Sequence, residues 1–347
     1  MWVAPLRMDI GTLLDRVKNP FFQHGKAEYY LAERDGAVVG RIAAIRNDAH
    51  GQFHPEEQHV GFFGFFECVD DQAVADALFQ SATEWLKAEG LNVMRGPASF
   101  STNDECGLLV DGFDTPPVIM NPHNPRYYQP LVERAGFVKV MDLLCYEGGG
   151  ADDTPPPQRL IDGARKMAER YKITLRKLDM KRFEAEVAKV KEVYNSAWGK
   201  NWGFIPMTDA EIDALAKALK PVVVPELIVF AEIEGKLIGM GVTIPDFNVA
   251  LKHNPSGRLF PFGLLKILWY RRTIRRARTL ILGVMPEYRR TGVDGLLYEW
   301  TWREAKKRGL CWGEASWLLE TNAAIRNGME KMGFRVYKTL RMYDKAL

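Results

Sequence analysis

The chain has 347 residues, of which 47% are hydrophobic and 26% are charged, and its formal net charge is +3 at pH 7. This length and composition suit two hydrophobic cores, and the small charge argues against a dedicated nucleic-acid-binding protein. The four cysteines are too far apart for a structural zinc site, so we expect reduced thiols and no metal. With no signal-peptide pattern and no apolar run of 18 residues, we expect a cytoplasmic protein that could lie peripherally on the inner membrane face.

An apolar hairpin near the start of the chain returns in the second half. Residues 28–44 and 229–243 both read as two apolar strands around an acidic-Gly turn. Glycine supplies the positive φ that such a tight turn requires. The turn glycines, Gly36 and Gly235, are 199 positions apart.

The end of the first half is also repeated. Residues 131–146 resemble residues 329–343, and Gly136 and Gly333 are 197 positions apart. Two matches at nearly the same offset predict two copies of one structural unit.

Glycines at 148–150 followed by prolines at 155–157 predict a linker between the two copies. We therefore expect an N-terminal unit over residues 1–150 that lacks an opening strand and helix, a linker and connecting helix over residues 151–171, and a C-terminal unit over residues 172–347.

The C-terminal unit mixes strands and helices around its early hairpin. Apolar runs predict strands over residues 173–179, 227–233, 237–244, 279–284, 312–318 and 335–343. Helical patterns cover residues 181–198, 208–219, 293–308 and 322–332. The order predicts an α/β (α+β) fold, in which each unit has a mixed, mostly antiparallel twisted sheet flanked by helices.

Residues 281–297 (ILGVMPEYRRTGVDGLL) run from an apolar strand through an Arg- and Gly-containing turn into a helix. A helix N-terminus offers free N–H groups and the positive end of a dipole, which suit a pyrophosphate. Gly292 would let the backbone approach an anion closely, and Arg289 and Arg290 would add charge. The alternative is a plain strand–turn–helix with solvated arginines.

Residues 286–293 (PEYRRTGV) resemble the acyl-CoA pyrophosphate loop of the GNAT superfamily, whose pattern is Arg/Gln-x-x-Gly-x-Gly/Ala. Asn322, followed by Gly333 and Phe334, is similar to the second motif of that superfamily. The resemblance implies an acyltransferase that binds acyl-CoA, with the pantetheine arm on the strand before the loop. The acyl-CoA-binding residues that it implies are Leu282, Gly283, Val284, Arg289, Arg290, Thr291, Gly292, Val293, Gly295 and Asn322.

The chain departs from the superfamily pattern in two places. Asp294 stands at the last Gly/Ala of the loop, and because a carboxylate repels phosphate we expect it to point away and cap the helix. Met329 stands where many members carry a Tyr that protonates the thiolate, so Tyr337 or Tyr343 would have to serve. The counterpart loop in the first half, residues 64–71, has acids instead of Gly and Arg, so we expect no CoA site there.

Five further segments are similar to the bacterial ceramide-synthase-like branch of the superfamily: residues 19–22, 61–67, 101–107, 201–204 and 259–265. This resemblance implies transfer of a fatty acyl group from acyl-CoA to the amine of a long-chain, sphingoid-type base.

Direct attack by an amine needs a general base, and a carboxylate whose pKa is raised by burial can serve. The catalytic candidates are Glu314, Glu320, Tyr337 and Glu105. The candidates for binding the acceptor are Trp198, Asn201, Trp202, Phe204, Asn103, Asp104 and His123. Alternatively, the acids could be solvated residues at strand ends or could cap turns. The aromatic residues could instead belong to the hydrophobic core.

Residues 259–278 (LFPFGLLKILWYRRTIRRAR) pass from apolar and aromatic residues into five arginines. The segment could lie on an anionic membrane, or form a core helix followed by a solvated basic turn. Binding of nucleic acid is the weakest alternative because the rest of the chain is not basic.

Three functions remain open from the sequence. The first is an acyl-CoA-dependent N-acyltransferase, the second a non-catalytic acyl-CoA-binding protein, and the third a two-unit aminoacyl transferase of the cell-wall peptide type. The Arg-x-x-Gly loop favours CoA over an aminoacyl-tRNA donor.

Overall fold

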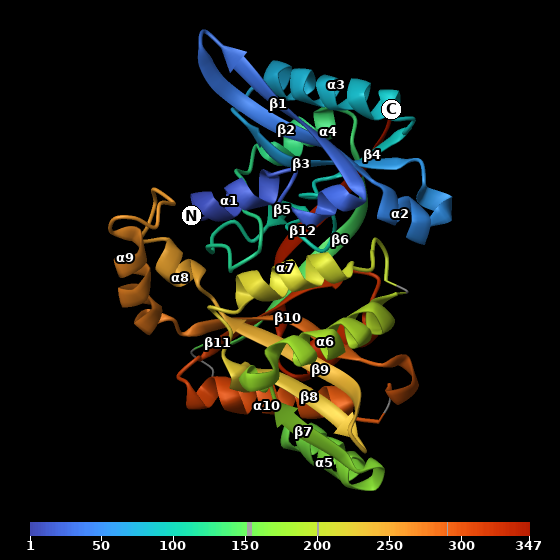
Figure 1. Cartoon of the computed structure of the whole chain (residues 1–347), viewed down its shortest axis with the longest axis vertical. Coiled ribbons are helices and arrows are strands. Elements are labelled where there is room, and N and C mark those ends of the chain that lie inside the picture. The colour runs from blue at the N-terminus through green and yellow to red at the C-terminus, as the bar shows by residue number, and fades with distance from the viewer. Residues whose placement is uncertain (151–154, 200, 290) are drawn as a thin grey trace.

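A computed structural model describes residues 1–150, 155–199, 201–289 and 291–347. The strands of this part of the chain form one 12-stranded sheet in the order β1-β2-β3-β4-β12-β6-β11-β10-β9-β8-β7, with β5 paired to β12. Figure 1 shows two stacked parts, each with helices packed on its portion of the sheet. The predicted α/β fold is confirmed, and most strand pairs are antiparallel, whereas β3–β4 and β10–β11 are parallel.

The first half forms the upper part of Figure 1. Its elements are α1 (Arg7–Leu14), β1 (Gly25–Arg34), β2 (Ala37–Asn47), α2 (Asp48–Phe53), β3 (Val60–Cys68), α3 (Gln72–Ala88), β4 (Val93–Gly96), β5 (Leu108–Asp111), α4 (Tyr128–Arg134) and β6 (Val138–Gly149). The loop that lacks a CoA motif joins β3 to α3, and Asp71 occupies this helix N-terminus by accepting a hydrogen bond from the backbone of Ala73.

The second half forms the lower part. Its elements are α5 (Gln158–Tyr171), β7 (Ile173–Lys177), α6 (Phe183–Trp198), α7 (Asp209–Leu219), β8 (Ile228–Ile233), β9 (Lys236–Pro245), α8 (Asn248–Leu251), α9 (Gly263–Tyr270), β10 (Arg276–Val284), α10 (Val293–Lys307), β11 (Trp312–Leu319), α11 (Ala323–Lys331) and β12 (Arg335–Ala346). The predicted strands and helices of this half are all present, with ends that differ by at most three residues.

Helices cover both faces of the part of the sheet that belongs to the second half, as alternate residues of β8 show. Ile228 and Phe230 pack in the same cluster as Val193 of α6. Val229 and Ala231 pack with Leu297 of α10 on the opposite face. Successive side chains of a strand point to opposite faces, so a strand covered on both sides needs a continuous apolar run. This run was the sequence signal for β8.

The last strand of each half lies in the sheet of the other half. β6, which ends the first half, pairs with β11, and β12, which ends the chain, pairs with β4 and β5. The two strands also pair with each other at the centre of the sheet. The chain division that we expect at residue 150 therefore does not coincide with a division of the sheet, and the assignment of the two units stays a prediction.

Residues 151–154 of the expected linker lie outside the described residues. In the described part of the chain, no helix is both long enough and apolar enough to cross a bilayer.

Candidate acyl-transfer site

A cavity opens where β10 and β11 separate. Arg276–Thr279 pair in parallel with Trp312–Ala315, after which β10 continues beside β9 while β11 continues beside β6. The cavity has a volume of about 1000 Å³. Its walls include Leu282, Gly283 and Val284 on β10, and Glu314, Ala315 and Ser316 on β11. A register shift between Thr279 and Ile281 leaves Leu280 opposite no residue of β9, and Leu280 also lines the cavity.

One face of α10 forms another wall. Asp294, Tyr298, Trp302 and Lys306 line the cavity at intervals of four residues, so the cavity follows this helix for roughly 18 Å at 1.5 Å per residue. Apolar residues of α11 and the turn after it also line the cavity, namely Ile325, Met329, Met332 and Phe334. The cavity is at the upper end of the size range for small-molecule sites and is mostly apolar, which suits a flexible ligand with a long hydrocarbon part.

The predicted phosphate loop lies at one end of this cavity. Gly292 takes a φ of +77° at the N-cap of α10, a conformation that favours glycine. Arg289 lines the cavity, whereas Arg290 lies outside the described residues. Thr291 donates its hydroxyl hydrogen to the carbonyl of Tyr288 at 2.6 Å, which closes the turn.

Two residues of the loop face α5 and the core instead. A Cβ on Gly295 would lie 3.0 Å from the Cβ of Ala164, so glycine allows α5 to pack closely on α10. Val293 is 1% exposed and packs in the core with Leu297. At the other wall, Asn322 lines the cavity and caps α11 by accepting a hydrogen bond from the backbone of Ile325.

The structure contradicts our expectation for Asp294. Its side chain caps no backbone group of α10, and the residue lines the cavity. A side chain caps a helix from the N-cap position, which is Gly292 here, whereas Asp294 lies inside the first turn of α10.

Glu314 is the one predicted acid that lies in the cavity wall. Its side chain accepts hydrogen bonds from Asn121 at 2.6 Å and from the hydroxyl groups of Ser316 and Tyr337. Burial raises the pKa of the Glu314 carboxyl above the ordinary 4.5, and the positive charge of Arg278 opposes the rise. A buried carboxyl with a raised pKa that borders a ligand-sized cavity is a candidate proton acceptor.

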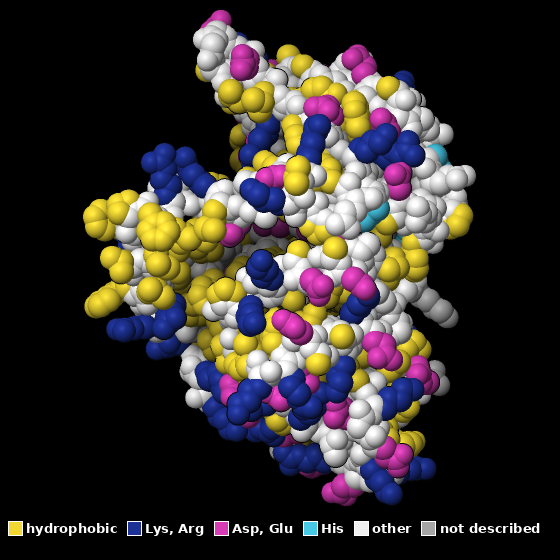
Figure 2. Space-filling model, in the orientation of Figure 1, with side chains coloured by type: hydrophobic (Ala, Val, Ile, Leu, Met, Phe, Trp, Pro, Cys, Tyr) yellow, Lys and Arg dark blue, Asp and Glu magenta, His cyan; other side chains and the backbone are white. Residues whose placement is uncertain are grey.

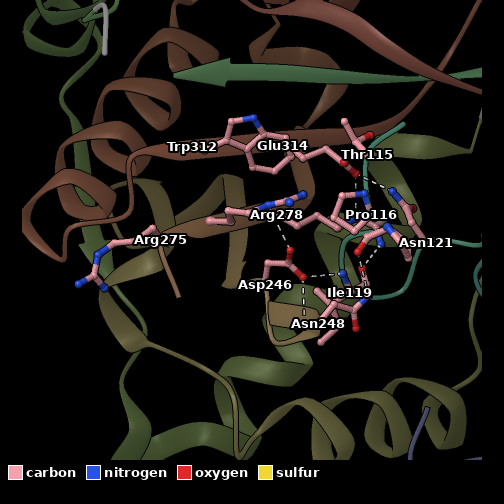
Figure 3. Close-up of polar contacts among 12 residues, drawn as sticks. Thr115, Pro116, Ile119, Asn121, Asp246, Asn248, Arg275, Arg278, Trp312 and Glu314 are labelled. Atoms are coloured by element: carbon pink, nitrogen blue, oxygen red, sulfur yellow. Dashed lines mark hydrogen bonds and ion pairs between the residues drawn. The ribbon is translucent and has the colours of Figure 1, made fainter. Parts of the chain in front are cut away.

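A network of buried polar side chains holds Glu314 in place (Figure 3). Arg278, 5% exposed, lies between Glu314 and Asp246, with its Nε 3.9 Å from the carboxylate of Glu314. Arg278 also donates to the carbonyl of Ile119 at 2.5 Å, and Asp246 accepts from the Ile119 backbone at 2.9 Å. Ile119 and Asn121 belong to the first half, so both halves hold the carboxylate in place.

The other predicted catalytic residues lie outside the cavity lining. Glu320 binds Lys139 at 2.8 Å and the backbone of Asp142 at 2.9 Å. Tyr337 contacts Glu314 but does not line the cavity, which makes it a positioning residue. Tyr343, the other predicted proton donor, is 1% exposed and donates to Glu133 in the first half, so it cannot reach a thiolate.

Asp104 and Glu105 are exposed, and neither lines the cavity, although the protein nearby partly desolvates both carboxyl groups. This desolvation raises the pKa of Asp104 to about 7, and Glu211 and Glu105 contribute to the rise. The pKa of Glu105 is also raised by desolvation, against the positive charge of Arg278. Arg278 therefore influences both Glu105 and Glu314.

Of the residues predicted to bind the acceptor, Trp198 and Asn201 line the cavity. A Cβ on Gly283 would overlap the ring of Trp198, so the glycine in β10 allows this ring to pack directly against the strand. Asn103 donates to the carbonyl of Ile205 at 2.9 Å and joins the two halves.

Three predicted acceptor residues have structural contacts instead. Trp202 stacks under Arg95 at 5.0 Å, and Phe204 is 6% exposed against the ring of Phe53. Burial lowers the pKa of His123 to about 4, so its imidazole is neutral at pH 7, and it does not line the cavity.

Sequence reasoning missed two residues of the site. Asn121, two positions before His123, is 193 positions from Glu314, and nothing local distinguishes it from a turn residue. Tyr298 packs in the same cluster as Met329, the residue that stands where the superfamily Tyr is expected. Tyr298 follows Asp294 by four residues on the predicted helix, and this spacing was the sequence signal that could have identified Tyr298 as a site residue. Burial raises the pKa of the Tyr298 phenol, and Asp294 contributes to the rise, so the phenol stays protonated.

Comparisons with known proteins agree with this architecture. The chain is 38% identical over 353 residues to a bacterial ceramide synthase from Caulobacter vibrioides, a match that covers all of this chain and 90% of that protein. It is 35% identical over 354 residues to protein YghO from Escherichia coli, a match that covers all of this chain and 88% of that protein. No family model matches the chain.

Two solved structures share the fold. A GCN5-related N-acetyltransferase from Sphaerobacter thermophilus is 14% identical, with a TM-score of 0.53 over 92% of this chain and 80% of that one. A tandem GNAT protein from the clavulanic acid biosynthesis pathway is 10% identical, with a TM-score of 0.52 over 94% of this chain and 84% of that one.

Proposed function

Because the chain belongs to the tandem-GNAT acyltransferases of the bacterial ceramide-synthase-like branch, we propose that it transfers a fatty acyl group from acyl-CoA to the primary amine of a long-chain, sphingoid-type base. The observation that carries this proposal is the 1000 Å³, mostly apolar cavity with the buried Glu314 in its wall. A site for acetyl transfer to a small amine would not need that length of apolar wall.

The acyl donor lies along β10. Its diphosphate binds at the N-terminus of α10, where Gly292 exposes backbone N–H groups and Arg289 adds positive charge. The pantetheine arm runs beside residues 281–284, and the fatty acyl chain follows α10 past Trp302. The GNAT fold of the C-terminal half supports this orientation of the donor.

The acceptor amine enters from the side of Asp104 and Glu105, whose carboxylates suit an ammonium group. Glu314 removes a proton from the ammonium group, and the neutral amine that results attacks the thioester carbonyl carbon. The C–S bond then breaks, and the CoA thiolate leaves and takes the proton of the Tyr298 phenol. As the amide forms, the nitrogen loses its second proton, which restores the Tyr298 phenol. Asn121, Arg278 and Tyr337 orient the Glu314 carboxylate and do not react.

We also propose that the acceptor is a membrane lipid that the protein reaches by peripheral contact. The relative named a ceramide synthase supports a sphingoid acceptor, because a ceramide is the N-acyl derivative of a sphingoid base.

The test is mass-spectrometric detection of the product. Purified protein is incubated with palmitoyl-CoA or acetyl-CoA and with sphinganine or a short amine, beside a Glu314→Gln variant. We expect an N-palmitoyl product from sphinganine that the variant makes at least about 10²-fold more slowly. Equal rates with the short amine would overturn the long-chain acceptor. Binding of acyl-CoA without product from either amine would favour a non-catalytic binder, and activity that requires charged tRNA would favour an aminoacyl transferase.

A further inference from the structure

A group of exposed apolar side chains surrounds α9. This α9 surface comprises Phe260, Phe262, Leu264, Leu265, Leu268 and Trp269. Phe260 is 74% exposed, and Phe262 and Trp269 are 67% and 66% exposed. In Figure 2 these side chains form a yellow projection on the left of the molecule, with dark blue Lys and Arg side chains above and below it.

The exposure of α9 excludes a core helix, which was one of the two main alternatives from the sequence. Of its eight residues, only Gly263 and Ile267 are buried. A helix that belonged to the core would bury its leucines and its tryptophan. A contiguous apolar patch of this kind is uncommon on a monomeric soluble protein and marks a contact surface.

The charged side chains in the chain segment around α9 are all positive. Between Asp246 and Glu287 the sequence contains no acidic residue and eight basic ones, which are Lys252, Arg258, Lys266, Arg271, Arg272, Arg275, Arg276 and Arg278. This segment therefore carries +8, and since the whole chain carries +3, all other residues together carry −5. Arg278 belongs to the network around Glu314, and Arg276 pairs with Asp246 of that network at 3.4 Å. The other six basic residues are exposed.

The α9 surface lies on the same side of the molecule as one end of the cavity. The carbonyl of Arg275, which follows α9, accepts hydrogen bonds from the backbones of Cys311 at 2.9 Å and Trp312 at 3.2 Å. Cys311 and Trp312 both line the cavity. In Figure 1, α9 and the C-terminal end of α10 lie on the left of the molecule.

We infer that the α9 surface docks the protein peripherally on an anionic phospholipid membrane. The apolar side chains enter the boundary between headgroups and acyl chains, and the flanking arginines bind lipid phosphates. Docking in this way brings the Cys311 end of the cavity close to the bilayer. The hydrocarbon chain of a membrane lipid can then pass into the cavity without crossing water. This last step rests on the proposed function, whereas docking itself does not.

A second copy of the chain fits this surface less well. A two-fold dimer through α9 would place the same patch on both subunits and bring two arginine clusters together. Like charges at such an interface repel, whereas an anionic bilayer neutralises them.

The experiment measures sedimentation of the full-length protein with vesicles, without acyl-CoA. Vesicles of phosphatidylcholine alone are compared with vesicles that also contain the anionic lipid phosphatidylglycerol, whose negative surface potential attracts basic segments. We expect the protein to bind the anionic vesicles at least about tenfold more tightly, and added salt to weaken the binding.

Two variants test the surface directly. Leu265→Glu combined with Trp269→Glu removes apolar contacts, and Arg271→Glu combined with Arg272→Glu reverses charge. We expect each to weaken binding at least about tenfold. The matched control is Leu31→Glu combined with Val138→Glu, because these apolar side chains are 63% and 66% exposed on the first half. The control should bind within about twofold of the unmodified protein.

Equal binding by the α9 variants and the control would overturn the inference. So would a dimer, detected by light scattering, that Leu265→Glu with Trp269→Glu converts to monomer while vesicle binding is absent. Because the vesicle assay involves no turnover, its failure leaves acyl transfer untouched, and a failure of acyl transfer leaves docking untouched.

Discussion

Arg95 in β4 donates two hydrogen bonds, of 2.8 and 2.9 Å, to the carboxylate of Asp344 in β12, although 249 positions separate the two residues. Arg95 is 4% exposed and also donates to Glu57 at 2.8 Å. A hydrogen bond to His50 and the guanidinium of Arg95 lower the pKa of Glu57 to about 2. This cluster fastens the last strand of the chain to the first half, and so links the two halves at a point far from the cavity.

Replacing Arg95 by Leu should therefore destabilise the whole protein. The substitution removes the buried guanidinium that pairs with the partly exposed carboxylates of Glu57 and Asp344, so it should cost at most the roughly 3–5 kcal/mol of unfolding free energy that breaking a fully buried pair costs. Urea denaturation followed by fluorescence measures the loss. Lys18→Leu, which removes the exposed partner of Asp15, should cost less than about 1 kcal/mol. Equal effects of the two substitutions would show that the Arg95 cluster is not a stabilising link.

The exchange of β6 and β12 between the halves could not be predicted from the sequence. The two strands belong to the repeated segments, so their apolar patterns are alike and either strand could complete either half. Only the long-range pairing decides, for example the register that places Tyr343 opposite Gly96. The hairpins were predictable because a turn such as Asp35-Gly36 is a local signal.

At the site, too, local features could be predicted from the sequence, whereas long-range contacts could not. The phosphate loop is contiguous in sequence, and the positive φ of Gly292 follows from its residue type. The partners of Glu314 come from a loop in the other half, and no local pattern marked Asn121. The burial of Glu314, which separates it from Glu320, also depends on contacts that only the folded chain provides.

Glu314→Gln should lower kcat by roughly 10²–10⁴-fold with little change in the KM for acyl-CoA, because the amide keeps the shape but cannot take the proton. A base acts only when it is ionised, and burial raises the pKa of Glu314 above 4.5. The rate of the unmodified enzyme should consequently fall as the pH drops through a value higher than that of an ordinary glutamate. Glu320→Gln, outside the cavity, should keep a rate within about twofold. If Glu320→Gln lost rate and Glu314→Gln did not, Glu320 rather than Glu314 would be the general base.

Tyr298→Phe should lower kcat by roughly 10²-fold if the phenol protonates the leaving thiolate. The second variant, Met329→Tyr on the Tyr298→Phe background, returns a phenol to the position where the superfamily carries one, within the same cluster of side chains. We expect it to restore at least part of the rate in steady-state assays. A Tyr298→Phe enzyme with full activity would exclude this residue as the acid.

Arg289→Ala should weaken the binding of CoA by roughly 10–100-fold, since a charge-assisted hydrogen bond contributes about 1.5–3 kcal/mol. Titration calorimetry with CoA at two salt concentrations measures both the affinity and the electrostatic share of the binding free energy. Arg134→Ala, on the exposed end of α4, is the control and should bind CoA as the unmodified protein does. An unchanged affinity in Arg289→Ala would place the diphosphate elsewhere.

Trp302→Ala should shift the preference toward longer acyl-CoA substrates. Trp302 lines the cavity one helical turn beyond Tyr298, so loss of its indole lengthens the space available to the acyl chain. Each buried methylene contributes about 0.8 kcal/mol, so two more carbons should change the ratio of kcat/KM values by up to roughly tenfold. The ratio is measured by competition between palmitoyl-CoA and stearoyl-CoA. Trp300→Ala is the matched control, because Trp300 donates to the carbonyl of Glu226 and does not line the cavity. A shift in the control but not in Trp302→Ala would mean that the acyl chain does not follow α10.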